Sequence, residues 1–237
     1  MNKIPPMAVL ATVLFATACG DGSTAVDQTP RVRFFNATTG MSGSGGFTRN
    51  GQFVTGSALP FGQSTQACQP VDPGVTSFGF GAAGAGGTAL AGNALATLNN
   101  QTIAAGGDYT MVATGSAASP QLYLIDNSFS GSPGANQAAV RFLNLAPGPN
   151  PIPNIFYAFK AWPPVDADAL FAAGLLVGSP SDFKATASGA TTFYTIIGHE
   201  METLGTHPVN LQAGSVSTLV IVPKPSGGFQ LINLPRC

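Results

Sequence analysis

Charged residues are scarce in this sequence: Asp, Glu, Lys and Arg make up 8% of it, and the formal net charge is −1. An average soluble domain has roughly 25% charged residues. The chain therefore has neither the basic field that a nucleic-acid-binding protein needs nor an acidic tail. We expect no nucleic-acid partner.

Uninterrupted helix-forming segments are also lacking, because 30 Gly and 19 Pro are spread over the 237 residues. The glycines follow no three-residue period, which excludes collagen. The 16 Phe, with short runs rich in Val, Leu and Thr, are typical of strands between turns. A hydrophobic content of 44% is enough for one large all-β domain or two domains of about 100 residues.

The first eighteen residues predict a secretory signal peptide. Lys3 precedes a single apolar run from Met7 to Ala18, and Asp21 follows shortly after it. A membrane-spanning helix needs about 20 apolar residues, so this run is too short for a permanent span. We expect residues 1–18 to be removed.

The end of this segment, Phe15-Ala-Thr-Ala-Cys19-Gly20, resembles a bacterial lipoprotein box, whose Cys receives diacylglycerol and becomes the new N-terminus. Ala16 stands where Leu is commonest, and cleavage near Ala18 by an ordinary signal peptidase is the alternative. By resemblance to lipoprotein sorting rules, Gly20 favours the outer membrane. We expect a membrane anchor at Cys19, a tether over residues 19–30 and a bacterial envelope location, otherwise a periplasmic or secreted one.

The chain has three cysteines, an odd number for an exported protein. If Cys19 carries lipid, Cys68 and Cys237 remain as a pair, and an exported location is oxidising enough for a disulfide. The alternative is a buried free thiol at Cys68 and a frayed C-terminus. We predict the disulfide.

Three segments recur in the same order, which indicates a tandem duplication. The three pairs are Arg31-Val-Arg-Phe-Phe-Asn36 with Ala139-Val-Arg-Phe-Leu-Asn144, Pro73-Gly-Val-Thr-Ser-Phe78 with Ser188-Gly-Ala-Thr-Thr-Phe193, and Ile103-Ala-Ala-Gly-Gly-Asp-Tyr-Thr-Met-Val112 with Leu211-Gln-Ala-Gly-Ser-Val-Ser-Thr-Leu-Val220. We predict two repeats, over residues 31–135 and 136–237.

Each repeat carries strand patterns. Val32 and Phe34 alternate with arginines, as expected where one sheet face meets the core and the other meets water. Asn50-Gly51 predicts a hairpin turn, since both residues tolerate positive φ. Residues 167–177 have room for a helical turn or two. The fold class predicted is all-β, with two tandem Ig-like or transthyretin-like antiparallel β-sandwich domains.

These segments resemble the repeats of the bacterial domain-of-unknown-function family four-three-nine-seven. The resemblance rests on three motifs and covers roughly residues 31–235. The first motif occurs as Val32-Arg-Phe-Phe-Asn-Ala37 and as Val140-Arg-Phe-Leu-Asn-Leu-Ala-Pro147. The second occurs as Gly62-Gln-Ser-Thr-Gln66 and as Gly178-Ser-Pro-Ser-Asp182. The third occurs as Ala105-Gly-Gly-Asp-Tyr-Thr110 and as Ala213-Gly-Ser-Val-Ser-Thr218. The resemblance implies an envelope or secreted protein with β-sandwich repeats and no catalytic residue to carry over.

One polar cluster contains both histidines and both glutamates of the chain: His199, Glu200, Glu202 and His207. His and carboxylate side chains are metal ligands, but the spacing is not that of a helical H-E-x-x-H site. We interpret the segment as a solvated loop after a strand, and keep a metal-dependent binder or hydrolase as the alternative.

Other polar and aromatic residues carry weaker signals. Asp166 and Asp168 lack the Gly and distant Glu of an EF-hand loop, so a turn is favoured over a Ca²⁺ site. Arg33 and Arg141 are equivalent in the two repeats and mark either a binding site or ion pairs on the outer strand face, for example to Asp126. Trp162 is either sandwich core or a contact patch for protein or carbohydrate.

From these features we expect a non-enzymatic cell-envelope lipoprotein that acts as a binding or structural surface module and needs no cofactor. Its partners are the membrane, through Cys19, and an envelope protein or a carbohydrate. A simple spacer between the membrane and another component is a third reading that the sequence does not separate from binding.

Overall fold

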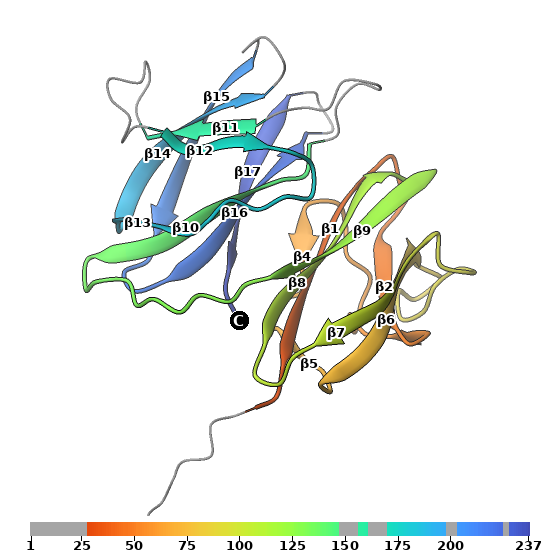
Figure 1. The fold of residues 1–237 in the computed structure, drawn as a ribbon. Coiled ribbons are helices and arrows are strands. Elements are labelled where there is room, and N and C mark those ends of the chain that lie inside the picture. Colours follow the sequence, from red (N-terminus) through yellow and green to blue (C-terminus); the bar gives the residue numbers. More distant parts are fainter. Residues whose placement is uncertain (1–27, 147–155, 161–169, 198–202, 225–227) are drawn as a thin grey trace, which may run out of the picture.

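The computed structural model describes residues 28–146, 156–160, 170–197, 203–224 and 228–237. In these residues every regular element is a strand, and the strands form two β-sandwiches (Figure 1). The predicted signal peptide, Cys19 and the tether up to residue 27 lie outside the described residues. Among the residues described, no helix is long and apolar enough to cross a membrane.

In the described part of the chain, the first sandwich contains nine strands and the second contains eight. The first nine are β1 (Arg31–Thr39), β2 (Gly45–Arg49), β3 (Gln52–Phe53), β4 (Gln63–Ser64), β5 (Gln69–Pro70), β6 (Gly74–Ala82), β7 (Ala96–Ile103), β8 (Asp108–Ser116) and β9 (Ser119–Asp126). The others are β10 (Gln137–Asn144), β11 (Phe156–Phe159), β12 (Leu170–Leu175), β13 (Lys184–Ala187), β14 (Gly189–Ile197), β15 (Thr203–Leu211), β16 (Val216–Pro223) and β17 (Phe229–Pro235).

Both sandwiches have the same strand order. The first has sheets β4-β1-β8-β9 and β3-β2-β6-β7, with β5 also paired to β1; the second has β13-β10-β16-β17 and β12-β11-β14-β15. Neighbouring strands are antiparallel except for one parallel pair in each sandwich, β1 with β8 and β10 with β16. The prediction of all-β sandwiches is confirmed. The sequence reasoning expected antiparallel sheets and did not foresee the one parallel pair in each sandwich.

The repeated motifs make equivalent hydrogen bonds in the two sandwiches. The Asn36 side-chain amide donates to the Leu59 carbonyl over 2.8 Å, and its Oδ1 accepts from the Thr38 N–H. Asn144 does the same with the Leu175 carbonyl, at 2.9 Å, and the Ala146 N–H. The motif Asn therefore satisfies two backbone groups in each sandwich, one in the segment beside its strand and one two residues further along the chain.

The other motif residues act in the same way. The Phe34 N–H donates to the Thr65 hydroxyl, and the Phe142 N–H donates to the Ser181 hydroxyl. Each hydroxyl belongs to the G-x-x-[ST] segment that pairs with the first strand of its sandwich. The two short motifs are thus parts of one backbone arrangement that occurs twice.

Each sandwich has its own aromatic core. In the first, Phe34 packs on Phe47 with ring centroids 5.2 Å apart. In the second, Phe142 lies among other phenylalanines and its ring centroid is 5.1 Å from that of Phe193. These side chains are fully buried, so the alternating pattern of β1 and β10 correctly predicted the residues that face the cores.

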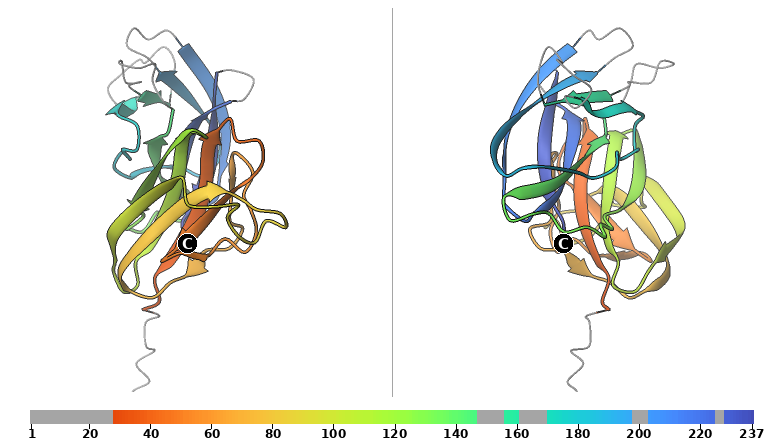
Figure 2. Two further views of the ribbon diagram at one scale, coloured as in Figure 1. Left: turned by 90° about the vertical axis from the view of Figure 1, so that its right-hand side faces the viewer. Right: turned by 60° about the vertical axis from the view of Figure 1, so that its left-hand side comes forward.

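A third hydrophobic cluster lies between the two sandwiches. It joins buried residues of β1, β8 and β9 to buried residues of β10, of β16, of β17 and of the segment just after β10: Phe35, Ala37, Val112, Ile125, Leu143, Leu145, Val220, Val222 and Leu234. The sheet that contains β1 therefore packs face to face on the sheet that contains β10, and the views in Figure 2 show the two sandwiches side by side. The four sheets form a continuous stack.

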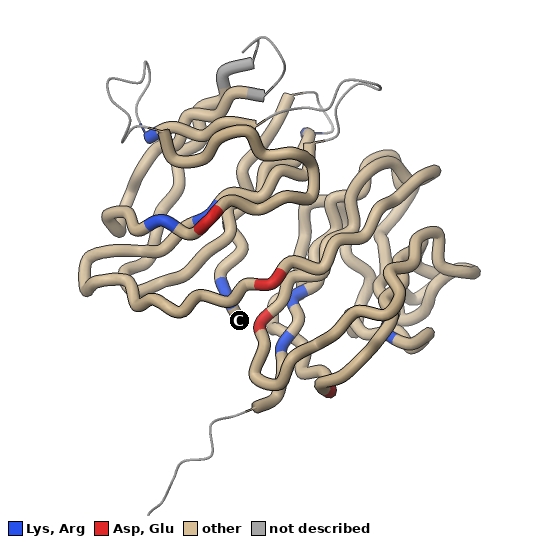
Figure 3. The backbone as a smooth tube through the Cα atoms, in the orientation of Figure 1, with Lys and Arg blue, Asp and Glu red and all other residues tan. Residues whose placement is uncertain are grey.

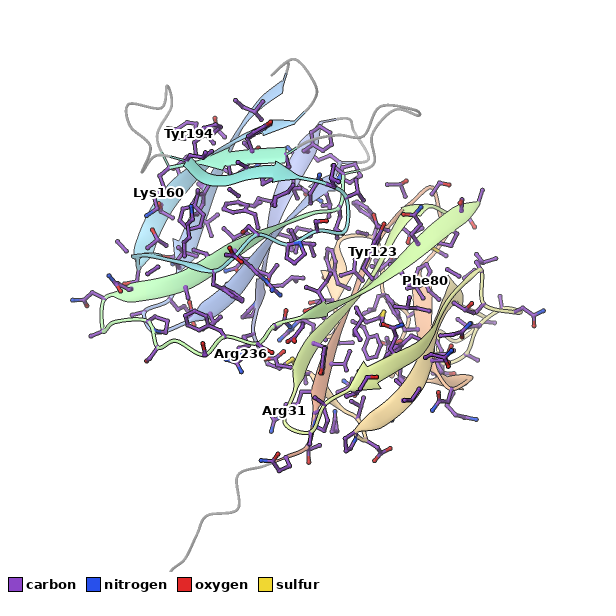
Figure 4. All side chains as sticks on the ribbon, in the orientation of Figure 1. Arg31, Phe80, Tyr123, Lys160, Tyr194 and Arg236 are labelled. Atoms are coloured by element: carbon purple, nitrogen blue, oxygen red, sulfur yellow. A yellow bond between two sulfur atoms is a disulfide. The ribbon has the colours of Figure 1, made fainter. Side chains whose placement is uncertain are left out.

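This interface is close-packed. The Tyr123 ring, labelled in Figure 4, occupies the space beside Gly178, where an added Cβ would lie 2.2 Å from a ring atom. The Thr114 hydroxyl donates across the interface to the Leu145 carbonyl over 3.1 Å. Gly178 also has a φ of +79°. Both this backbone conformation and the contact with the Tyr123 ring therefore favour glycine at this position.

Two local predictions have opposite outcomes. The Asn50-Gly51 turn is confirmed, because φ is +48° and +80° at these residues and the turn joins β2 to β3. The helical turn within residues 167–177 is wrong for its described part, since Leu170–Leu175 is a strand paired with β11. Phe171 and Ala172 become part of the second core, and this burial selects the strand.

Candidate functional site

A groove of about 530 Å³ lies where the two sandwiches meet, at the N-terminal ends of β8 and β16. Both sandwiches line it, with Thr29, Arg31, Gly106, Gly107 and Asp108 from the first, and Gly214, Ser215, Val216, Pro235, Arg236 and Cys237 from the second. The volume is within the roughly 300–1,000 Å³ range of small-molecule sites. We take this interdomain groove as the candidate functional site.

Equivalent turns form two walls of the groove. Gly106 and Gly214 have φ of +67° and +73°, respectively, and each turn leads into the strand that is parallel to the first strand of its sandwich. The left-handed backbone there requires residues such as glycine. The repeated Ala-Gly motif therefore supplies small residues on both sides of the groove.

A disulfide closes one side of the groove. Cys68, between β4 and β5, is bonded to the C-terminal residue Cys237, with the Cα atoms 5.8 Å apart. The Arg33 guanidinium donates to Cys68 Sγ over 3.3 Å and to the Thr65 carbonyl over 2.9 Å. The predicted pair thus forms, and it joins the first sandwich to the end of the second.

A polar network crosses the interface beside the disulfide. Arg236 Nε donates to Asp108 Oδ2 over 3.0 Å, and this ion pair links the two sandwiches. Asn127 Nδ2 donates to Asp108 Oδ1 over 2.9 Å, and Arg141 Nη2 donates to Asn127 Oδ1 over 2.6 Å. The Arg141 Nε donates in turn to the Thr218 hydroxyl.

Arg33 and Arg141 do not face water, contrary to the prediction from strand alternation. Their exposed fractions are 8% and 5%, because the second face of β1 and of β10 is covered by the other sandwich. Burial lowers the pKa of Arg33, with nearby Asp108 opposing the shift. Burial lowers the pKa of Arg141 to about 10, with Asp126 and then Asp108 opposing it. Both guanidinium groups remain charged at neutral pH.

Of the predicted histidine cluster, His207 is the one member within the described residues. His199, Glu200 and Glu202 lie outside the described residues, which contain no group of three His, Cys, Asp or Glu placed to hold a metal ion. His207 is 9% exposed, and its Nε2 lies 2.8 Å from the Thr195 hydroxyl on the neighbouring strand. Its observed contact is a hydrogen bond between β14 and β15.

His207 is expected to make stability fall at mildly acidic pH. Burial, and to a smaller extent the charge of Lys224, lowers the pKa of His207 from 6.5. The unfolded chain therefore takes up this proton first as the pH falls below about 6.5, and the folded state loses stability until folded His207 is itself protonated. Thermal unfolding across this range should show a drop in Tm that is smaller in His207→Gln. An identical drop in the variant would contradict this assignment.

Trp162, Asp166 and Asp168 also lie outside the described residues. The sequence reasoning missed the groove residues Asp108 and Arg236, and also Asn127 in the network beside them. Asp108 lies in the Ala-Gly motif of the first repeat, whereas the second repeat has Val216 at that place. This difference between the copies, and the position of Arg236 beside Cys237, were the available signals.

A comparison with protein-family models identifies the family of this chain. The family model for a domain of unknown function, DUF4397, matches residues 30–152. This match covers just over half of the chain, including the whole first sandwich and β10 of the second. No curated protein sequence gives a significant match. The chain belongs to the DUF4397 family.

Proposed function

We propose that this protein is a non-enzymatic lipoprotein of the bacterial cell envelope, anchored through Cys19, whose two sandwiches form one stiff binding module. The observation that carries the proposal is the interface: a shared hydrophobic layer, the Cys68–Cys237 disulfide and the Arg236–Asp108 ion pair all join the sandwiches. Such a unit is suited to holding a site at a fixed place near a membrane. We infer that it arose by tandem duplication, which the equivalent strand orders and motif bonds support.

The interdomain groove is the proposed binding surface. The one acidic side chain among the described lining residues, that of Asp108, is already bound to Arg236 and Asn127. The described lining has no histidine, and its cysteine is part of the disulfide, so it offers no activated nucleophile with an adjacent base. These features favour binding over catalysis.

Replacing Cys19 with serine tests the anchor. The wild-type protein is expected in the membrane fraction, with an N-terminus at Cys19 and the added mass of acyl chains, because several acyl chains together give stable membrane binding. Cys19→Ser should move most of the protein to a soluble fraction or leave its signal peptide uncleaved. Intact mass spectrometry of both forms, with separated inner and outer membranes, is the measurement.

Cys68→Ser is the control for this experiment, since it changes a cysteine that is bonded to Cys237. It should still fractionate with membranes and carry the acyl mass. A wild-type protein without lipid, or one whose N-terminus lies elsewhere, would refute the lipoprotein part of the proposal and make the protein periplasmic or secreted.

A further inference from the structure

We propose that the Cys68–Cys237 disulfide is a site of thiol–disulfide exchange, at which an incoming dithiol attacks Cys237 and Cys68 leaves as a thiolate held by Arg33. The inference goes beyond the proposed binding role and depends neither on the lipid anchor nor on a ligand in the groove. It starts from the place of the disulfide, at the chain end, where charged residues of both sandwiches gather (Figure 3). The partner is a small dithiol or a protein with two thiols, which supplies both electrons for the reduction.

The sulfur atom of Cys68 lies beside a buried cation. The Arg33 guanidinium donates to Cys68 Sγ over 3.3 Å, and a second nitrogen of the same group donates to the Thr65 carbonyl over 2.9 Å. Arg33 is 8% exposed, and its Nε is buried without a hydrogen-bond partner. A guanidinium stabilises a thiolate more than a neutral sulfur, and water screens the charge little in such a place. Arg33 therefore favours Cys68 as the leaving group.

The negative groups around the disulfide leave this effect in place. Asp108 of β8 interacts electrostatically with Arg33, but both Asp108 oxygens already accept hydrogen bonds, one from Arg236 and one from an asparagine side chain. The C-terminal carboxylate belongs to Cys237 and is no longer tied to Cys68 once the bond breaks. Arg33, in contrast, contacts the Cys68 sulfur directly.

Cys237 is accessible and lies at the very end of the chain. It lines the interdomain groove, which gives an incoming thiolate access to this residue. β17 ends at Pro235, and Arg236 is held by its ion pair with Asp108. A mixed disulfide on Cys237 therefore displaces a single terminal residue, while the ion pair and the hydrophobic layer still join the sandwiches. Reduction then leaves two thiols that remain close enough to form the bond again.

The exchange consists of two substitutions at sulfur. One thiolate of the dithiol attacks Cys237 Sγ, so that a new S–S bond forms while the Cys68–Cys237 bond breaks and its electron pair leaves on Cys68 Sγ. The second thiolate of the dithiol attacks the dithiol's own sulfur in this mixed disulfide and releases Cys237 as a thiolate. The dithiol is oxidised to a disulfide and the protein pair is reduced by two electrons. Of the two dithiol protons, one passes to Cys237 and the other to solvent.

The first test traps the mixed disulfide. Purified mature wild type is incubated with glutathione, quenched with acid at early times, and mapped peptide by peptide with mass spectrometry, so that the state of Cys19 does not enter the result. Glutathione is expected on Cys237 at least about threefold more often than on Cys68, because the better leaving group directs the attack to the other sulfur. Equal labelling, labelling mainly on Cys68, or no exchange at all would overturn the proposal.

The second test measures what Arg33 contributes. In the reduced protein, the rate at which the uncharged reagent iodoacetamide alkylates Cys68 is followed against pH. The midpoint is expected at least about one pH unit lower in wild type than in Arg33→Gln, and Arg33→Lys, which keeps the charge, should recover part of the difference. The C-terminal carboxylate is the same in all three proteins, so the comparison isolates Arg33. Equal midpoints in wild type and Arg33→Gln would contradict the proposal.

Arg49→Gln is the matched control. Arg49 pairs with Asp72 in the first sandwich, so this variant should keep the wild-type midpoint, and an equal shift in both arginine variants would also count against the proposal. Circular dichroism of reduced wild type should show a folded protein, and unfolding on reduction would reject a reversible site. If Arg33→Gln does not fold, the glutathione distribution in wild type decides alone. Failure of these tests leaves the Cys19 fractionation result, and with it the proposed function, unaffected.

Discussion

Replacing Cys68 with serine is expected to lower the free energy of unfolding by about 5 kcal/mol. The bond joins residues 169 positions apart, and cross-linking so long a loop removes a large share of the conformational freedom of the unfolded chain. The loss should appear as a lower midpoint in urea unfolding followed by circular dichroism. The same shift is expected for wild type unfolded in the presence of a thiol reductant.

Cys237→Ser provides the comparison, because it removes the same bond from the other end. The double variant should be no less stable than either single variant, since one bond is lost in each case. Cys68→Ser, unlike Cys237→Ser, also replaces the sulfur atom that accepts a hydrogen bond from Arg33. A difference in unfolding free energy between the two single variants therefore measures the contribution of that hydrogen bond. A loss below about 1 kcal/mol in all three would show that the covalent bond adds little to an interface already held by packing.

The sequence predicted the two-sandwich fold well because its signals are local. Val32 and Phe34 alternate with arginines, the turn at Asn50-Gly51 needs positive φ, and each of these patterns depends only on neighbours in the chain. The disulfide followed from counting cysteines. The motif hydrogen bonds of Asn36 and Asn144 explain why the short repeated segments have the same sequence.

The groove was not predictable in the same way, because it depends on which faces of the two sandwiches meet. Alternation shows that a strand has two faces, but it does not show what covers the second face. That face of β1 was assigned to water because of Arg33, although Phe35 lies on it too. Leu143 on the corresponding face of β10, with Leu145 just after the strand, was the signal that this face is buried.

The second large effect on stability is expected from truncating two adjacent residues of β1, Phe34 and Phe35. Phe34 and Phe35 are both fully buried in β1, but Phe34 packs in the first sandwich and Phe35 packs between the sandwiches. Truncating either to alanine is expected to cost about 3–5 kcal/mol, the usual range for a buried Phe. The two variants should differ in how the protein unfolds.

Phe34→Ala weakens the core of the first sandwich, which contacts the second through an unchanged interface. Hydrogen exchange should then be accelerated mainly in β2, β6 and β8, the strands that share this core. Phe35→Ala weakens the contact that couples the sandwiches, so urea unfolding should separate into two transitions and exchange should rise in β10 and β16 as well as in β1 and β8.

The comparison decides whether the sandwiches stabilise each other. If Phe35→Ala still unfolds in one transition with the exchange pattern of Phe34→Ala, the Phe35 side chain stabilises the first sandwich but is not what couples the two sandwiches. If the transitions separate, the unit that places Arg31 opposite Arg236 is maintained by this layer as well as by the disulfide. The geometry of the groove then depends on residues that do not touch it, because both walls are fixed by the packing of Phe35 against the second sandwich.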